Sequence, residues 1–262
     1  MLALRGMMKL ARRLSRLLTF AAVLAPSLLH AQPPAAPAPA PAPPPPLWTG
    51  NAGFGLSLNR GNTSTTNFNA AFEASRDPKT DSVWKFKGLY LRGETDGDLT
   101  VDRLLLDGRN ERTFATRAYA FVQAQFLEDE FKEIDWLFAP SGGLGYKLIA
   151  TPKTSLNADA GLGVKFEQNH GFERRTDAVV TSGEKFEYKL SPTATITQSF
   201  GSLWKAKDFG DALYTFTTGV AAALTTRTQL KFELLDTYAS QPPNVEVKKN
   251  DVALITALVY KF

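Results

Sequence analysis

Apolar and polar residues alternate with a period of two along most of the chain after Leu47. The clearest segment is 155–167, in which every even-numbered residue is apolar and every odd-numbered residue is polar or glycine. Successive side chains of a β-strand point to opposite faces, so the segment predicts one apolar face and one polar face. It is longer than an ordinary globular strand of about 5 to 6 residues and fits a tilted membrane strand of about 9 to 11 residues with its ends.

The same period predicts an all-β fold: a transmembrane, antiparallel, up-and-down β-barrel of about 12 strands, within a range of roughly 10 to 14. One stretch is ambiguous, because Leu104, Leu105 and Leu106 fit neither face. A soluble sandwich or lipocalin-like barrel is the alternative, and its strands would be shorter. The predicted strands are 48–59, 65–76, 82–93, 99–112, 117–127, 136–149, 154–168, 184–191, 193–203, 212–223, 228–240 and 251–262.

The links between these strands predict which end of the barrel faces the periplasm. A barrel with both termini in the periplasm alternates short periplasmic turns with longer outer loops. The predicted turns are 77–80, 113–116, 150–153, 191–192 and 224–227. The predicted outer loops are 92–98, 128–135, 169–183, 204–211 and 241–250, with 60–64 as a short exception.

The first 46 residues differ in kind from the rest. Residues 1–31 carry five basic residues and no acidic one, then an apolar run from Leu17 to Leu29, which predicts a cleaved signal peptide. Residues 32–46 are almost entirely Pro and Ala, a composition that favours an extended periplasmic linker and leaves room for a periplasmic partner. Residues 47–262 are the predicted barrel, exported to the outer membrane of a Gram-negative cell.

Charge and cysteine content exclude several classes. The net charge of +4 includes the five cations of the signal, so the remainder carries roughly 25 basic and 26 acidic residues. The excess of basic residues therefore lies in the signal and does not indicate nucleic-acid binding. Absence of cysteine excludes a disulfide framework and a lipoprotein anchor.

The last strand ends on Tyr260, Lys261 and Phe262. An aromatic final residue with another aromatic two places earlier resembles the signal that the barrel-assembly machinery recognises. Other aromatics fall near predicted strand ends, where amphipathic rings lie at the level of lipid headgroups. We expect outer-membrane lipid and lipopolysaccharide as the surroundings of this wall. These aromatics are Trp48, Tyr90, Tyr146, Tyr188, Trp204, Tyr214, Tyr238 and Tyr260.

Three stretches carry a family resemblance: 53–63 (GFGLSLNRGNT), 142–148 (GGLGYKL) and the terminal YKF. Together they resemble the salt-induced outer membrane protein family, the YdiY-like proteins. The resemblance covers nearly all of the chain after the proline segment. It implies an outer-membrane β-barrel whose molecular activity is unassigned, with a link to salt or osmotic stress. Independently of the family, the glycine and asparagine of 60–63 suit a tight hairpin.

Charged residues on the predicted strands indicate what fills the barrel. A Lys or Arg facing hydrocarbon near the membrane midplane costs about 2–4 kcal/mol, so such residues belong on the lumen face. Their mixed signs favour ion pairs across the lumen over a strongly selective field. The predicted lumen-facing charges are Lys85, Lys87, Asp159, Lys165, Glu167, Glu187, Lys189, Lys231 and Glu233.

Candidate catalytic groups are few, and we predict no catalytic, cofactor-binding or metal site, no cofactor and no enzymatic activity. His170 is the one histidine after the signal, and Asp177 and Ser182 follow it in the sequence. An outer-membrane hydrolase built on these three is conceivable. Five acidic residues between Glu128 and Asp135 could hold a divalent cation weakly, although a solvated loop is the ordinary role of such a cluster.

The sequence therefore favours a small passive pore or a closed structural barrel of the envelope, and it does not decide between them. A binding or adhesion barrel, acting through loops 169–183 and 241–250, is a third reading, and the hydrolase is a fourth. All four share one fold.

Overall fold

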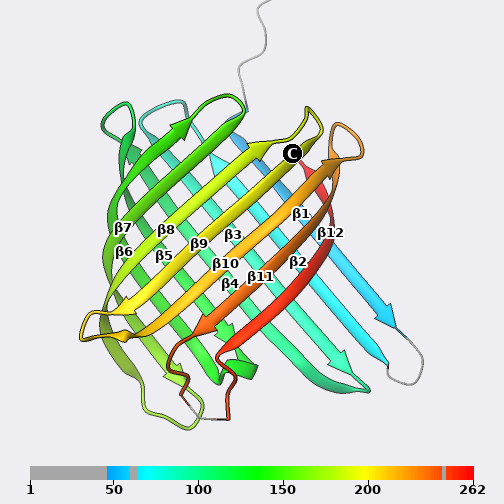
Figure 1. Cartoon of the computed structure of the whole chain (residues 1–262), viewed down its shortest axis with the longest axis vertical. Helices are drawn as coiled ribbons and strands as arrows, with labels where there is room; N and C mark the ends of the chain where they lie inside the picture. Colours follow the sequence, from blue (N-terminus) through cyan, green and yellow to red (C-terminus); the bar gives the residue numbers. More distant parts are fainter. Residues whose placement is uncertain (1–45, 60–63, 244–245) are drawn as a thin grey trace, which may run out of the picture. The chain divides into compact units, whose positions relative to one another are not determined.

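A computed structural model describes residues 46–59, 64–243 and 246–262, which form a closed antiparallel barrel (Figure 1). Its strands are long because each one runs the full height of the wall, from one rim of the barrel to the other. The elements are β1 (Trp48–Asn59), β2 (Thr65–Arg76), β3 (Ser82–Thr95), β4 (Asp98–Thr113), β5 (Ala118–Asp129), the 3-10 helix η1 (Glu130–Lys132), β6 (Ile134–Ala150), β7 (Thr154–Asn169), β8 (Arg175–Lys189), β9 (Ala194–Lys205), β10 (Asp208–Ala223), β11 (Thr228–Ala239) and β12 (Asn250–Lys261).

Each strand pairs with its neighbours in the sequence, and β1 pairs with β12 to close the ring. Closure joins Asn51 to Lys261 and Phe54 to Leu258 in register. Gly50 and Phe262 then exchange backbone hydrogen bonds of 3.1 and 3.0 Å. A Cβ at Gly50 would lie 2.7 Å from the Phe262 ring, so a residue without a side chain is needed where the last aromatic ring covers the first strand.

The barrel has two distinct ends. At one end β1 begins and β12 ends; we call this the terminal end, and it is at the top of Figure 1. At the other, the loop end, lie the links 96–97, 130–133, 170–174 and 206–207, together with 240–243 and 246–249. The predicted twelve-stranded antiparallel barrel is confirmed, with most strand bounds displaced by only a few residues.

The expected contrast between short turns and long loops is wrong at several links. Strand β8 begins at Arg175 instead of 184, and β9 and β10 extend to a two-residue link at 206–207. Asp96 and Gly97 have φ angles of +53° and +94°, so this Asp-Gly pair makes a tight hairpin where a longer loop was predicted. The cause is closure, because each residue of β7 needs a backbone partner and Arg175–Tyr188 supplies it.

The two faces of the wall separate apolar from polar side chains. Arg103, Leu105 and Asp107 alternate on the inner face of β4, so Leu104 and Leu106 point outward and the ambiguous stretch is resolved. Large apolar side chains are exposed on the outer face around the whole ring, including Phe54 of β1, Leu162 of β7 and Leu254 of β12.

Aromatic residues on the outer face gather near both rims. At the terminal end Trp48 and Trp84 each stack with Phe86, with ring centroids 6.2 and 6.1 Å apart. Towards the loop end Trp204 donates a hydrogen bond of 2.9 Å to the Tyr214 hydroxyl, whose ring also contacts Tyr238. Two such groups, separated by the length of the strands, have the arrangement of the aromatic girdles of membrane barrels.

Some predictions concern residues outside the described ranges. They are the signal of 1–31, the linker of 32–46 except its last residue, and the Gly-Asn hairpin of 60–63. In the part of the chain that the structure describes, no helix is long and apolar enough to cross a membrane.

Candidate functional site: the barrel lumen

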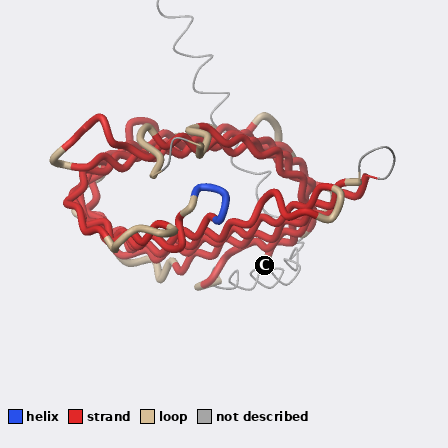
Figure 2. The backbone as a smooth tube through the Cα atoms, turned by 90° about the horizontal axis from the view of Figure 1, so that it is seen from below, coloured by secondary structure: helices blue, strands red, loops and turns tan. Residues whose placement is uncertain are grey.

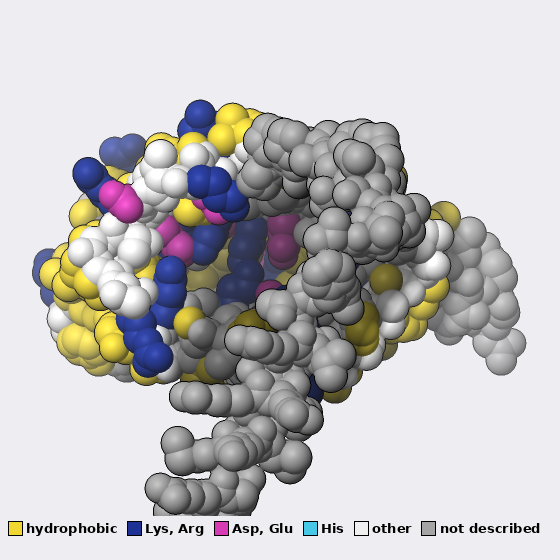
Figure 3. Space-filling model, turned by 90° about the horizontal axis from the view of Figure 1, so that it is seen from above, with side chains coloured by type: hydrophobic (Ala, Val, Ile, Leu, Met, Phe, Trp, Pro, Cys, Tyr) yellow, Lys and Arg dark blue, Asp and Glu magenta, His cyan; other side chains and the backbone are white. Residues whose placement is uncertain are grey.

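The lumen is lined by charged side chains that reach one another from strands that are not neighbours. Arg109 of β4 pairs with Asp159 of β7 at 2.7 Å, although β5 and β6 lie between those strands in the wall. Only side chains that point into the barrel can meet in this way. Seen from the terminal end, Lys, Arg, Asp and Glu side chains line the hollow of the barrel (Figure 3).

The structure places most of the predicted lumen charges in ion pairs. Lys85 pairs with Glu111 at 2.5 Å, Lys165 with Glu167 at 2.8 Å, and Lys231 with Glu233 at 2.5 Å. Asp159 is the partner of Arg109. Lys87 and Glu187 lie within electrostatic range of Glu73 and Lys185 respectively, and Lys189 is exposed at the terminal end of β8.

Several lumen residues that carry the interior electrostatics were missed by sequence reasoning. Glu73 of β2 lies within range of Lys87, Lys185 and Lys231, which come from three other strands. Lys185 has the same parity on β8 as the predicted Glu187, so the alternation would have found it. Its side chain is exposed to solvent although the wall surrounds it, so water reaches this level of the lumen.

The β5–β6 link folds into the lumen at the loop end. Viewed from that end, η1 lies inside the ring of strands (Figure 2). Asp129 begins the turn, because its carboxylate accepts a hydrogen bond from the backbone N–H of Lys132 at 3.2 Å. Glu133 ends it in the left-handed conformation, with a φ of +55°. The turn directs the Lys132 side chain inward, where only 1% of the residue is exposed.

Lys132 and Arg103 anchor this turn to the opposite wall. The Lys132 ammonium pairs with Asp251 at 3.0 Å and donates hydrogen bonds to the carbonyl oxygens of Lys248 and Lys249. Arg103 pairs with Asp129 at 2.5 Å and donates to Thr237 at 3.1 Å. Elements β4, β5, η1, β11 and β12 thus share one network, which we call the anchor network; Arg103, Asp129 and Lys132 are buried in it, and the Asp251 side chain is 39% exposed.

Apolar side chains fill much of the lumen around the anchor network. Leu91, Leu235 and Ile255 form one buried cluster between β3 and the β11–β12 wall. A second cluster includes Leu127, Leu137, Val179 and Leu203. The loop-end half of the lumen is therefore packed. In the terminal half, by contrast, the Lys85 side chain is 39% exposed and Lys185 is exposed, although their neighbours are half-buried.

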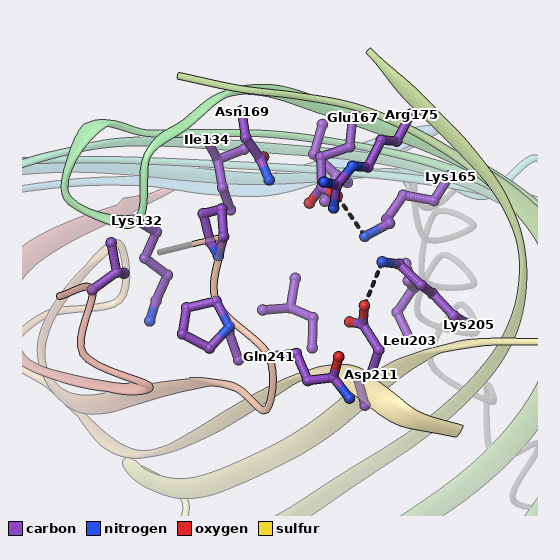
Figure 4. A pocket seen from close by; sticks show the side chains of 17 residues that line it. Lys132, Ile134, Lys165, Glu167, Asn169, Arg175, Leu203, Lys205, Asp211 and Gln241 are labelled. Carbon is purple, nitrogen blue, oxygen red and sulfur yellow. Dashed lines mark hydrogen bonds and ion pairs between the residues drawn. The ribbon is translucent and has the colours of Figure 1, made fainter. Parts of the chain in front are cut away.

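A cavity of about 140 Å³ remains beside η1 at the loop end. Lys165, Glu167, Lys205 and Asp211 line one side of it, and the ion pairs Lys165–Glu167 and Lys205–Asp211 are drawn in Figure 4. Asn169 lines the cavity from the end of β7 and is 6% exposed. The remaining wall is mostly aliphatic and proline side chains, and Lys132, Arg175 and Gln241 also line it.

The three residues of the hypothetical hydrolase are not brought together. His170 is exposed and its nearest acid is Asp135, at 3.5 Å. Asp177 pairs with Lys205, whereas Ser182 hydrogen-bonds Ser202 at 2.7 Å. Asp177 and Ser182 are separated by an odd number of strand positions, so they lie on opposite faces of β8.

The acidic cluster and the adhesion loops also differ from expectation. Asp129, one of the five acidic residues, pairs with Arg103 inside the lumen. No group of three or more metal-ligating side chains occurs in residues 46–59, 64–243 and 246–262. Most of the predicted loop 169–183 is strand, which leaves 170–174, 240–243 and 246–249 as described loop-end surface.

The chain belongs to a family described as a protein of unknown function, DUF481, whose sequence profile matches residues 52–262. No curated protein matches it. An outer membrane channel from Pseudomonas putida has 12% identity and a TM-score of 0.49, with 82% of this chain and 95% of that chain covered. The NanC porin has 10% identity and a TM-score of 0.47, with coverages of 81% and 96%. The channel DcaP of Acinetobacter baumannii has 10% identity and a TM-score of 0.39, with coverages of 82% and 95%.

Proposed function

We propose that the protein is a narrow, water-filled channel of the bacterial outer membrane, which admits small polar solutes and is constricted at its loop end by η1. The observation that carries the proposal is Lys185, a solvent-exposed cation enclosed by the barrel wall. A barrel with only a structural role is expected to fill such a space with packed side chains.

The outer surface supports a membrane location. Leu162 is 70% exposed and Leu254 is 77% exposed, and in water such apolar area would favour aggregation. In a bilayer it is matched by lipid, and a closed barrel leaves no unpaired sheet edge in hydrocarbon. Lipopolysaccharide and phospholipid are then its neighbours, the terminal end faces the periplasm, and Tyr260 and Phe262 serve assembly.

The roles of residues 1–46 and the link to stress are proposals that follow from the sequence. Residues 1–31 would direct export, and residues 32–46 would form a spacer that holds or binds a periplasmic partner. The resemblance to the YdiY-like proteins suggests a role during salt or osmotic stress. A nearly neutral lumen fits that role, because its paired charges give little selectivity and change little when the ionic strength changes.

The constriction defines what must move during passage. A solute that crosses the loop end has to pass η1, which the Lys132–Asp251 ion pair and two backbone hydrogen bonds hold in place. The acyl chains outside the wall play no part in this step. Passage is therefore controlled by how often the anchor network opens.

The packed loop end also favours a second candidate, a closed structural barrel. In that case the anchor network and the apolar clusters would seal the lumen permanently, and the terminal half would be a water-filled cup. The two candidates differ in one measurable property, which is conductance.

Single-channel conductance of the refolded protein, lacking residues 1–31, in a planar bilayer at two salt gradients tests the proposal. Discrete steps, with larger steps in Lys132→Gln, would support a channel constricted by η1. Lys79→Gln is the matched control, because it removes one cation from an exposed turn outside the lumen. Silence of both the wild type and Lys132→Gln, with a folded barrel shown by slower gel mobility before boiling, would favour the sealed barrel.

A further inference from the structure

The cavity beside η1 contains a polar group without a partner. Asn169 is 6% exposed, and its Oδ1 atom has no hydrogen-bond partner among the described residues. The side chain points towards the cavity in Figure 4. An amide oxygen buried without a donor costs about 1–3 kcal/mol. The accessible surface of Oδ1 is below 1 Å², so a donor in the cavity reaches it when the amide turns about the Cβ–Cγ bond and its oxygen and nitrogen exchange places.

Positive charge exceeds negative charge around the same cavity. Lys165 and Lys205 are each paired with an acid that lines the cavity, Glu167 and Asp211. Arg175 also lines it, and among the described residues the structure gives its guanidinium no acidic partner; its Cζ lies 5.7 Å from the centroid of the Phe172 ring. A guanidinium that is free to make two parallel hydrogen bonds matches a carboxylate better than it matches a neutral group.

The remaining wall limits the size and the character of the occupant. Leu203, Leu213, Pro242 and Pro243 present apolar surface, and the volume is about 140 Å³. Drug-sized ligands need pockets of about 300–1,000 Å³, so only a small molecule fits. The carbon chain of such a molecule can lie against the leucines and prolines while its polar groups face Asn169 and Arg175.

We propose that this cavity is a binding site for a small hydroxylated carboxylate, with a ligand hydroxyl donating to Asn169 Oδ1 and the ligand carboxylate held by Arg175. The inference rests on the proposed function, because a ligand of this class would be a solute that the channel takes up at its loop end. Binding itself does not require conduction and is measured separately.

The test is calorimetric titration of the folded protein, purified from membranes in detergent, with three probes. Glycerate has both a carboxylate and hydroxyls, glycerol has the hydroxyls without the charge, and propionate has the charge without the hydroxyls. We expect saturable binding of glycerate and about tenfold or weaker binding of the other two. Equal binding of propionate and glycerate, or no saturable binding of glycerate, would overturn the proposal.

Two variants separate a binding role from a structural one. Arg175→Gln should weaken glycerate binding about tenfold and abolish the preference for glycerate over glycerol. Asn169→Leu should abolish binding while leaving the unfolding midpoint unchanged or raised, because it removes an unsatisfied buried group. A lowered midpoint with binding intact would show that Asn169 is merely structural. Lys79→Gln is the control with the same charge change outside the cavity.

The proposed channel and the proposed binding site can then be rejected independently of each other. Glycerate binding by a protein that is silent in a bilayer would support the site and reject the channel. Conductance steps that glycerate neither blocks nor alters, together with a flat titration, would support the channel and reject the site.

Discussion

The two halves of the lumen use the same kinds of residue in opposite ways. In the terminal half, ion pairs such as Lys85–Glu111 line a space that water enters, and Lys185 is exposed beside them. In the loop-end half, the Arg103–Asp129 pair is almost fully buried, and two apolar clusters occupy the same half of the lumen. The comparison shows that a charge inside a barrel can keep a lumen open or close it, and that the difference lies in what surrounds the charge.

Burial also decides what each pair contributes to stability. A solvated ion pair contributes about 0–1 kcal/mol, because water screens the charges and competes for them. A buried pair is costly to break, because removal of one partner leaves the other charge unpaired in a poorly solvated place. The following predictions use this difference, from the largest expected effect to the smallest.

The largest effect is expected from Arg103→Met. This change leaves Asp129 buried without its cation, so the free energy of unfolding should fall by about 3–5 kcal/mol. The measurement is urea unfolding of the micelle-bound barrel, followed by tryptophan fluorescence. Adding Asp129→Leu should restore most of the loss, because the second charge is then removed as well. A double variant as unstable as the single one would show that the pair is not the cause.

Lys132→Met should have the next largest effect. The variant loses the ion pair to Asp251 and the hydrogen bonds to two carbonyl oxygens, at a cost of about 1–3 kcal/mol. Since η1 is then held less firmly, hydrogen exchange of the 130–133 backbone amides should become faster while that of β7 does not. Unchanged exchange in 130–133 would mean that Lys132 does not anchor the turn.

Lys185→Glu should change conduction and leave stability nearly unaltered. Charge reversal exchanges repulsion from Lys85 and Lys87 for attraction, and attraction to Glu73 and Glu187 for repulsion, so the free energy of unfolding should change by about 1 kcal/mol or less. Reversal of one charge inside the lumen should shift the reversal potential towards that of a cation-preferring pore. An unchanged reversal potential in a conducting variant would place Lys185 outside the ion path.

The smallest effect is expected at the terminal-end turn, where Asp77 accepts hydrogen bonds from the side chain and the backbone of Lys79. These bonds hold the pKa of Asp77 below its ordinary value of 3.8. A lowered pKa in the folded state gives a contribution that is present above the unfolded pKa and lost as the pH falls through the folded value. NMR titration of the carboxyl checks this, and a midpoint at or above 3.8 would refute it.

Sequence reasoning found the wall of the barrel more completely than its interior. Period-two alternation located all twelve strands, because the inner and outer faces of a membrane barrel differ in polarity at nearly each position. It placed β8 too late, since Thr176, Asp177 and Thr181 lack a strong apolar face. The Asp96–Gly97 hairpin was readable from the sequence, because Asp-Gly is a strong signal for a tight turn.

The anchor network could not be read from the sequence. Asp129 and Lys132 belong to a run of charged residues that ordinarily form a solvated loop, and their partners Arg103 and Asp251 are distant in the chain. Arg103 also precedes Leu104, Leu105 and Leu106, and three consecutive leucines leave the inner face of this stretch unassigned in the sequence. No local pattern indicates that a loop turns inward, because the inward turn is stabilised by contacts that exist only after closure.

The sequence by itself determined the antiparallel barrel, its approximate strand count and the parity that sends charges such as Lys85 and Asp159 to one face, because these depend on local alternation. The tertiary structure alone decided which charges meet, which half of the lumen admits water, and that Asn169 and Arg175 share a cavity. The physical reason is closure: it brings strands such as β4 and β7, or β5 and β12, to face one another across a space whose width no single segment encodes.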